Sequence, residues 1–563
     1  MIARLKPYRF EIFFLALAVI PHLDISLSNP NTILDWYSSD DGFYYFQVAR
    51  NLAAGNGFTF DGLNPTNGFH PLWLFLITPI FAFAQIDLLL PLRLLIILSA
   101  LLSAATAILL YRILRRYASE FTAALAGVAW IVIPRIHDIT LHAGVEAGLN
   151  AFCILLFWQA LIIFGPAGNR KHTIGKLVVL GLLASLALMA RLDNVFLVAF
   201  GGLWIWLRLW QSPEEESRSK ASPWSWRFLT GFAFFGPIAI VMSIYIIWNQ
   251  LAFGTPTPIS GQVKLWWGTL RNTVYGFPVR HMAAFFGQFV TNHAELGPWS
   301  LLTTPLYAAA EELLAAFGQG FTVAARRVAL LSLGGILAAL GAALIWVERP
   351  FLNKSARGLG LLPFFLGCFA DITYYKLSGS VAQQPWYWVA QMLFLLVCLG
   401  LLIEALLRRL ARSLPPANRY LSMAGVILFT GLSLNFLAFV QSAIRAPGDG
   451  SNHFYLHRAA WLEAHTEDGA RVAITGAGNL AYFIHDRTIV NMDGLMSSYD
   501  YLVAMKAGSG AEFLADLGVD YIFGNEYILT ETNPYGPMLA GHLEPYEIFT
   551  FADRELPLWI FIP

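Results

Sequence analysis

The stretch DWYSSDDGFYYFQVARNLAAGNGFTFDGLNPTNGFHPLWLF, residues 35–75, decides how this chain is interpreted. It places two adjacent carboxylates, Asp40 and Asp41, directly after the first long apolar segment. A short amphipathic helix is predicted to begin at this pair and to end at Gly55 and Gly57, because four apolar side chains fall on one helical stripe. These side chains are Phe43, Phe46, Ala49 and Ala53. Two acids at the face of a bilayer are costly unless they are solvated or used, so the pair suggests chemistry on a lipid-linked substrate.

The composition is typical of a membrane protein. The chain has 563 residues, of which 57% are hydrophobic and only 13% are charged. A soluble protein of this length cannot bury so much apolar surface, which predicts an all-α polytopic membrane protein. Lys and Arg together number 36, as do Asp and Glu, so the charge balance gives no sign of nucleic-acid binding. The three cysteines lie in apolar runs and form no zinc-type cluster.

The apolar runs predict about eleven transmembrane helices of roughly 20 residues each. The N-terminal segment MIARLKPYRF is basic and shows no small-residue cleavage site, so it is interpreted as a retained anchor that begins on the cytoplasmic side. The basic loops RILRRY, GNRKH and RRLARSLPPANR then all fall inside, as the positive-inside rule requires. The predicted spans cover about residues 10–27, 91–111, 120–141, 148–165, 174–190, 194–210, 228–249, 328–347, 358–375, 387–406 and 419–441.

The long loop 28–90 and the C-terminal segment are predicted to lie outside. Within the loop, PLWLFLITPIFAFAQ (71–85) is short and contains two prolines, so it is interpreted as a juxtamembrane or re-entrant helix. A crossing there would turn the basic loops outward, against the positive-inside rule. The predicted organisation is a membrane module, 1–444, followed by an extracytoplasmic domain, 445–563, in the inner (cytoplasmic) membrane of a prokaryote.

The C-terminal segment has the pattern of a small α/β domain. The short runs RVAIT, TIVNMDGL and DYIFGN have strand composition, and they alternate with the helical runs HRAAWLEAH and GAEFLADLG. The segment GAGNLAYF places two glycines after a strand, which suggests a phosphate loop. Its spacing is not that of GxGxxG, and plain turn glycines are the more common explanation.

Asp40 and Asp41 allow two interpretations. Acids in the first turn of a helix favour the helix dipole, with Ser39 as the cap, and this alone would account for them. The functional interpretation is a general base that takes a proton from an acceptor hydroxyl. In glycosyl transfer with inversion, one carboxylate acts as the base and the leaving group departs as a phosphate, which needs cationic or hydrogen-bonding partners.

The predicted outer loops supply such partners. The candidates are His70, Arg191, Lys264, Arg280 and His281. Arg191 lies close to Asp193 between two apolar spans, where an ion pair between the two is the structural alternative. Lys264 ends a proline-rich turn, and its structural alternative is a lysine that extends to the membrane interface.

Four polar residues at the tip between the third and fourth spans stand four positions apart. They are Asp138, His142, Glu146 and Asn150, and they would form one polar ridge if the stretch is helical. The ridge offers ligand types for a divalent metal but lacks the specificity of HExxH. A polar cavity wall beside the acid pair and a helix end without a role are the alternatives. No cofactor is otherwise expected.

Aromatic residues are abundant, and most are expected to face lipid or the membrane interface. Those in the predicted outer loops offer rings on which a sugar could stack. They are Tyr44, Tyr45, Trp266, Trp267, Trp386, Tyr387 and Trp388.

With these residues in view, the chain resembles the GT-C superfamily of integral-membrane glycosyltransferases, which use polyprenyl-phosphate sugars. Protein O-mannosyltransferases, the aminoarabinose transferase acting on lipid A and mycobacterial arabinofuranosyltransferases belong to it. Their first outer loop carries an acid pair, an aromatic helix, a small-residue turn and a proline-aromatic helix, here DDGFYYFQVARNLAAGNG and NPTNGFHPLWLF. His70-Pro71 is similar to the HPP element of the mannosyltransferases, without its second proline.

The motifs are most similar to those of the bacterial arabinofuranosyltransferase-like branch. GVEA (144–147) is similar to its GMET tip and keeps Glu146. FGTPTPISGQVK keeps the lysine of an FG.LLPNT..AK segment as Lys264 but lacks its Asn-Thr, and VNMDGL in the tail is similar too. The resemblance implies that Asp40 is the catalytic base. It further implies that Asp41, His70, Glu146 and Lys264 are site residues.

The predicted function is transfer of a sugar, with inversion, from a polyprenyl-phosphate donor to an acceptor hydroxyl at the outer face of the membrane. The acceptor is a lipid, a glycan or a protein. The rival is a transporter or flippase for a lipid-linked or anionic solute, which Asp371 in the ninth predicted span would suit. Transporters show internal repeats and charges near the midplane, whereas here the candidate charges gather at one face. A nonenzymatic scaffold for the C-terminal domain is the third hypothesis.

Overall fold

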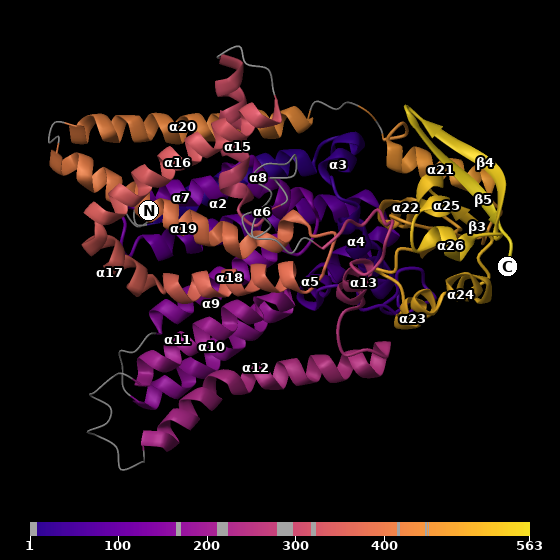
Figure 1. Cartoon of the computed structure of the whole chain (residues 1–563), viewed down its shortest axis with the longest axis horizontal. Coiled ribbons are helices and arrows are strands. Elements are labelled where there is room, and N and C mark those ends of the chain that lie inside the picture. The colour runs from indigo at the N-terminus through magenta and orange to yellow at the C-terminus, as the bar shows by residue number, and fades with distance from the viewer. Residues whose placement is uncertain are drawn as a thin grey trace.

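The structure is a computed structural model that describes residues 8–164, 170–210, 223–278, 297–316, 322–413, 417–444, 448 and 450–563. Its first part is helical, and its C-terminal part carries a sheet with short helices. The long helices run roughly side by side along the longest axis of the molecule, and the sheet lies at one end of them (Figure 1). This arrangement confirms a helical membrane part with a small α/β part attached.

Five helices of the described chain are long and apolar enough to cross a membrane. They are α6 (Leu89–Leu114), α10 (Arg170–Ala190), α12 (Pro223–Phe253), α16 (Val323–Val347) and α19 (Val389–Ser413). The count rises to seven if each of two bent helix pairs is one span, and the predicted number of eleven is not confirmed. The remaining predicted spans do form helices, namely α2 (Arg9–Ser26), α9 (Ala147–Ile163), α11 (Val195–Trp210) and α20 (Ala417–Ile444).

Two predicted elements differ from the structure. The predicted span 120–141 bends by 58° between α7 (Glu120–Val132) and the segment Pro134–His142, where Pro134 begins a new helix. The segment predicted as an inner loop after the eighth span is helix α17 (Arg349–Leu359). A left-handed Gly360 separates it from α18 (Leu361–Leu377), and the two helices meet at 68°. Proline and left-handed glycine both interrupt the helical hydrogen-bond ladder, which accounts for the two bends.

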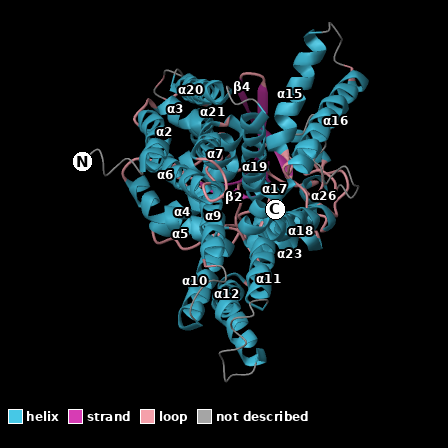
Figure 2. Ribbon diagram, turned by 90° about the vertical axis from the view of Figure 1, so that its left-hand side faces the viewer, coloured by secondary structure: helices cyan, strands magenta, loops and turns pink. Residues whose placement is uncertain are grey.

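Helices α12 and α16 present apolar side chains to the surroundings. Along α16, Leu331 and Trp346 are more than two thirds exposed, as are Phe232 and Leu251 along α12. Such continuous apolar exposure is expected only where lipid covers the surface. Figure 2 shows α15 (Ser300–Ala316) and α16 projecting from the bundle.

The first loop of the helical part folds into short helices. They are α3 (Pro30–Trp36), α4 (Asp40–Ala53), α5 (Pro71–Phe81) and the 3-10 turn η2 (Ala82–Gln85). Of these, α4 packs against α22 (Gly478–Phe483) of the C-terminal part. Helix α4 begins at the acid pair as predicted, with the Ser39 hydroxyl accepting the Asp41 backbone N–H at 3.2 Å. With 11 residues, α5 is too short to cross a bilayer.

The C-terminal part contains a five-stranded sheet in the order β2-β1-β3-β5-β4. Its strands are β1 (Arg471–Ile474), β2 (Thr488–Asn491), β3 (Tyr521–Phe523), β4 (Leu543–Phe551) and β5 (Arg554–Phe561). The first three are parallel and coincide with the predicted strands, whereas the antiparallel hairpin β4–β5 was not predicted. Six short helices accompany the sheet: α21 (Phe454–His465), α22 (Gly478–Phe483), α23 (Tyr499–Ala507), α24 (Gly510–Asp516), α25 (Glu526–Glu531) and α26 (Tyr535–Leu539).

Aromatic rings join α4 to the C-terminal part. The Phe43 ring lies 5.8 Å from that of Tyr482 and 5.6 Å from that of Phe483, both on α22, and 5.4 Å from that of Tyr455. Phe43, Tyr482 and Phe483 are buried, so this junction is part of one continuous apolar core. The first loop and the C-terminal part therefore hold a fixed relation to each other.

Candidate active site

A cavity of about 490 Å³ lies where the first loop, the helical part and the C-terminal part meet. Its walls come from α4, from the loop before α5, from the turn at Arg191, from α13 (Ile259–Trp267) and from η7 (Pro385–Trp388). Leu495 and Met496 of the C-terminal part close it. This volume is typical of a small-molecule site.

Six of the polar residues predicted for the site line this cavity. They are Asp41, Tyr44, His70, Glu146, Arg191 and Lys264. Asp40, Asp138 and His142 are not among the lining residues. Arg280 and His281 lie outside the described residues.

The Asp40 carboxylate is held by the N-terminus of α22. It accepts the backbone N–H of Gly478 at 3.0 Å and that of Asn479 at 2.7 Å, and the Asn479 side-chain amide at 2.6 Å. Three N–H donors thus bind this carboxylate at the start of α22. Asp40, which the resemblance implied to be the base, is thus bound to the C-terminal part and does not face the cavity.

The same contact answers the question of a phosphate loop in GAGNLAYF. The backbone N–H groups of Gly478 and Asn479 donate to Asp40, so a carboxylate of this chain occupies the position that a phosphate would take. A Cβ on Gly478 would lie 2.4 Å from the Asp40 backbone oxygen, so only glycine permits this approach. The glycine therefore serves the junction between the two parts.

Asp41 is half-buried and faces the cavity. Burial raises the pKa of its carboxyl to about 6, and the positive charge of Lys264 lowers this pKa less than burial raises it. The carboxylates of Asp40 and Asp493 also raise it. A carboxylate with such a pKa is ionised at neutral pH and is still basic enough to accept a proton.

Glu146 belongs to a buried charged cluster with Arg191 and Asp193. The Arg191 guanidinium donates to both carboxylates, with 2.6 Å between its Nη2 and Asp193 Oδ2. The Tyr45 hydroxyl donates to Glu146 Oε2 at 2.9 Å, and that of Tyr375 donates to Asp193 Oδ2 at 2.9 Å. Arg191 therefore makes the predicted ion pair with Asp193 and a second one with Glu146.

The pKa values of this cluster follow its contacts. Burial acts to raise the pKa of Glu146, but His70 and Arg191 outweigh it and the pKa is lowered. Burial lowers the pKa of His70, although the nearby carboxylate of Glu146 acts to raise it. The Nδ1 atom of His70 is buried and has no hydrogen-bond partner in the described part of the chain. It is available to a ligand as a donor or an acceptor.

Lys264 is the cavity cation that lacks a carboxylate partner among the described residues. Its buried ammonium donates to the Tyr387 hydroxyl at 2.7 Å and to the Ala382 backbone oxygen at 3.2 Å. Burial disfavours its charge, but Tyr387 and Asp41 outweigh this and raise its pKa. Two of its three N–H bonds are used by neutral groups, which leaves one donor and a full charge for an anion.

Aromatic rings form part of the wall, as the sequence predicted for Tyr387 and Trp386. The Arg191 guanidinium carbon lies 4.7 Å from the Tyr387 ring centroid, and the Lys264 ammonium lies 5.1 Å from the same centroid. Tyr387 thus positions both cations through its ring face.

The polar ridge predicted from Asp138 to Asn150 does not form. The chain turns at Gly144, which has a φ of +68°, so Glu146 begins the new helix α9 and faces the cavity. Asp138 and His142 lie on the preceding turn, η3 (Asp138–His142), outside the cavity lining. The fourth member, Asn150, accepts the Asn194 side-chain amide at 2.6 Å.

Asp493 was missed as a hydrogen-bond partner of the cavity residue Tyr44. It lies in VNMDGL, and its carboxylate accepts the hydroxyl of Tyr44 at 2.6 Å and the backbone N–H of Leu495 at 2.9 Å. Burial raises its pKa. The motif VNMDGL was the available signal, but nothing in the sequence indicated that it packs against α4.

Asp371, the residue that would suit a transporter, is buried on α18. Its carboxylate accepts the Gln391 side-chain amide at 2.9 Å. It lines a small void of about 10 Å³ that also touches Asp193, too small for a solute.

Comparison with solved structures shows the fold. The chain is similar to the archaeal oligosaccharyltransferase AglB from Archaeoglobus fulgidus, solved with an inhibitory peptide and a dolichol-phosphate. Its TM-score is 0.52 at 12% identity, over 98% of this chain and 74% of that one. The apo ArnT from Cupriavidus metallidurans gives a TM-score of 0.50 at 12% identity, over 99% of this chain and 98% of that one. ArnT from the same organism bound to undecaprenyl phosphate gives a TM-score of 0.50 at 11% identity, over 98% of this chain and 97% of that one.

Comparisons of the sequence itself reach less far. A family described as a domain of unknown function (DUF8728) matches residues 447–558, the segment that carries the sheet. No curated protein matches the sequence. The structural similarity extends over nearly the whole chain, and this chain therefore has the GT-C fold that its sequence motifs implied.

Proposed function

We propose that this chain is an integral-membrane glycosyltransferase that moves a sugar from a polyprenyl-phosphate donor to an acceptor hydroxyl, with Asp41 as the general base. The observation that carries the proposal is the position of Asp41 on the cavity, with a pKa of about 6 and the cation Lys264 nearby. The resemblance implied that Asp40 is the base, whereas this proposal assigns that role to its neighbour Asp41. Asp40 becomes a positioning residue, because its carboxylate is already bound by α22.

The chemistry follows from these two side chains. The acceptor oxygen forms a bond to the anomeric carbon on the face opposite the phosphate, while the bond from that carbon to the phosphate oxygen breaks. Asp41 takes the proton of the acceptor hydroxyl, and the polyprenyl phosphate leaves with the bonding electron pair. Lys264 neutralises the charge that grows on the departing phosphate, which is where fixed charges lower a barrier most. Attack from the opposite face inverts the configuration at the anomeric carbon.

The other cavity residues bind and orient. The cluster of Glu146, Arg191 and Asp193 offers carboxylate oxygens to sugar hydroxyls, and the wall of Tyr387 and Trp386 offers a surface on which a sugar can stack. His70 presents a ring nitrogen, Nδ1, without a partner in the described chain. These groups are suited to a polyhydroxylated ligand next to an anionic one.

The solved structures with this fold support the donor class. One was solved with a dolichol-phosphate and another with undecaprenyl phosphate, both polyprenyl phosphates. On this proposal residues 1–444 form the catalytic membrane module, and residues 445–563 form an extracytoplasmic domain that completes its cavity. The cavity opens at the outer face of the cytoplasmic membrane, the N-terminus lies inside, and the acceptor is a lipid, a glycan or a protein.

The test is sugar transfer by the purified protein from a synthetic polyprenyl-phosphate sugar. Asp41→Asn keeps the size of the side chain but cannot take the proton, so we expect a loss of roughly 100- to 10,000-fold in turnover. Asp40→Asn is the matched neighbour, and it should keep most of its turnover wherever the C-terminal part stays docked. Full turnover by Asp41→Asn, with loss only in Asp40→Asn, would restore the original assignment. Full turnover by the double variant would show that neither acid takes part in the reaction.

A further inference from the structure

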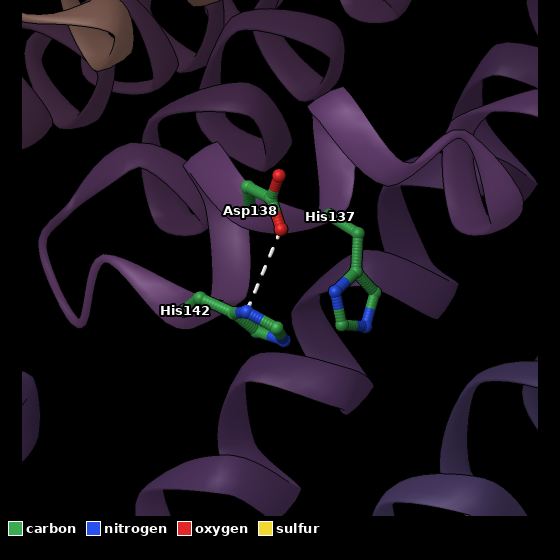
Figure 3. A group of neighbouring side chains, drawn as sticks. All are labelled: His137, Asp138 and His142. Carbon is green, nitrogen blue, oxygen red and sulfur yellow. Dashed lines mark ion pairs between the residues drawn. The ribbon is translucent and has the colours of Figure 1, made fainter. Parts of the chain in front are cut away.

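A second group of ligand-type side chains lies outside the cavity, where α8 (Pro134–His137) passes into η3. His137, Asp138 and His142 each offer one ligand atom, and these atoms lie within 4.8 Å of one another. The three side chains turn toward one another (Figure 3). His137 is fully buried, and Asp138 is half exposed. The group is thus anchored in the protein at one side and open at the other.

The backbone of η3 creates this grouping. It is a π-helical turn, in which the Ala143 N–H donates to the Asp138 oxygen five residues earlier, at 3.1 Å. In an α-helix, residues five apart point about 140° away from each other. The wider π turn brings His137 and His142 to one face, and such turns occur frequently at functional sites.

A chain of hydrogen bonds fixes the tautomer of His137. The Ala18 backbone oxygen can only accept, so the Nδ1 of His22 donates to it and the Nε2 of a neutral His22 is an acceptor. The Nε2 of His137, 2.8 Å from that acceptor, must then carry the proton. The Nδ1 of His137 is left with a bare lone pair, and it has no hydrogen-bond partner in the described chain. Metal-binding histidines are held in this way, by a hydrogen bond at the nitrogen that does not bind the metal.

The distance between Asp138 and His142 also fits two ligands of one ion. Oδ1 of Asp138 lies 3.5 Å from Nδ1 of His142, which is longer than a well-formed hydrogen bond. Two ligand atoms of a tetrahedral zinc lie about 3.3 Å apart when each bond is about 2.0 Å. The Nε2 of His142 is a second buried ring nitrogen that has no partner among the described residues. Without an ion, the lone pair on the buried Nδ1 of His137 would stay unsatisfied, whereas a bound ion would use it.

We propose that His137, Asp138 and His142 form a binding site for one Zn²⁺ ion, with a water as the fourth ligand. Two imidazoles and one carboxylate are a ligand set that zinc prefers, and soft sulfur ligands are absent from the cluster. The ion would fix the π turn to α2 through His22 and to α3 through Trp36, whose ring lies 4.1 Å from that of His142. The site is separate from the cavity and does not depend on the proposed transfer reaction.

The test is zinc binding by the purified full-length protein in detergent after treatment with a chelator. We expect one Zn²⁺ per chain by titration against a coloured chelator. Cobalt(II) in the same site should show the strong visible absorption of four-coordinate geometry. His22→Phe removes only the partner behind His137, so it should weaken binding by roughly 10- to 100-fold and keep the stoichiometry. Asp138→Asn and His142→Gln should weaken it further, and their combination should abolish it.

The controls separate this site from other histidines and from loss of folding. His453→Gln disrupts a histidine–carboxylate pair with Asp35 at 3.0 Å that has no third ligand in the described chain, and it should leave zinc binding unchanged. Because Asp138 is half exposed, Asp138→Asn should keep the elution profile and the melting temperature of the metal-free parent. Failure of the parent to bind zinc at micromolar concentrations would overturn the proposal. Binding that survives in the combined variant would overturn it equally.

Discussion

The two neighbouring carboxylates at the start of α4 lie in different surroundings, one on each of two faces of the helix. On the face toward the C-terminal part, Asp40 receives three N–H donors from α22. On the face toward the cavity, Asp41 is half-buried, and its pKa is raised to about 6. Adjacent residues of a helix point about 100° apart, so the pair cannot serve one site together. The comparison teaches that two adjacent acids of a motif need not share surroundings, and that the contacts of a remote segment decide which of them faces the cavity.

Lys264→Met tests the cavity side of this comparison through the cation rather than the base. It removes the cation that faces the leaving phosphate, and loss of one such group typically costs about 100- to 1,000-fold in kcat. Transfer kinetics of the purified variant measure this loss. Lys506→Met, at an exposed lysine of α23, is the matched control and should behave like the parent. A variant at Lys264 that loses only affinity for the acceptor would place the phosphate elsewhere.

The pH profile is the next largest effect. Protonated Asp41 cannot accept a proton, so kcat/KM should fall about tenfold for each pH unit below an apparent pKa of about 6. The positive charge of Lys264 lowers this pKa, so the acid limb should move to higher pH in Lys264→Met. Both profiles are measured with the same donor and acceptor. If the acid limb lies at the same pH in Lys264→Met as in the parent, the group that titrates is not Asp41.

Asp40→Ala tests the other face. The variant removes a charged acceptor from the N-terminus of α22, and we expect the junction to lose about 1–3 kcal/mol. Hydrogen exchange of residues 478–483 should accelerate, and the melting temperature should fall. Asp35→Ala breaks an exposed ion pair with His453 across the same junction and should cost at most about 1 kcal/mol. Equal losses of stability in Asp40→Ala and Asp35→Ala would show that Asp40 stabilises the junction no more than an exposed ion pair does.

The smallest expected effect is that of Asp41→Asn on the free energy of unfolding. Its sign follows from the pKa of Asp41. The folded pKa of about 6 lies above the ordinary value of 3.8, so the free energy of unfolding of the parent decreases as pH rises from about 4 through 6. At pH 8 the variant lacks the half-buried charge and should be more stable than the parent by roughly 1–2 kcal/mol, allowing for partial solvation. At pH 4 the two proteins should be equally stable. Thermal unfolding at both pH values measures the difference, and a variant less stable at pH 8 would contradict it.

The sequence predicted what depends on local pattern. Strands β1, β2 and β3 were evident from runs of β-branched and aromatic residues, and α4 was evident from its apolar stripe and from Ser39. The hairpin β4–β5 was not predicted, because β4 is largely exposed and contains Pro545, so it lacks the apolar alternation of a half-buried strand. The bend at Pro134 and the π turn of η3 were not predicted either, because one straight span of about 120–141 was assumed from the length a membrane crossing needs.

Sequence reasoning predicted many residues of the site but not how they are arranged in space. Asp41, Glu146 and Lys264 come from three separate segments, and the cavity brings them together. The role of Asp40 could not be predicted, because its partners Gly478 and Asn479 lie more than 400 residues further along the chain. Periodicity reports only on neighbours within a few turns. The same limit explains why Asp493 was missed, and why His22 and His137 were not recognised as neighbours of His142.

The contact between Asp40 and Gly478 also orders events during biosynthesis. It joins positions 438 residues apart, and Leu495 and Met496 add the last wall of the cavity. Asp41 and Lys264 lie in an incomplete cavity until residues 478–496 have folded and docked onto the helical part. Contacts of such long range form late because the intervening loop must first be closed. A fragment that ends before residue 478 would lack both this contact and the last wall of the cavity.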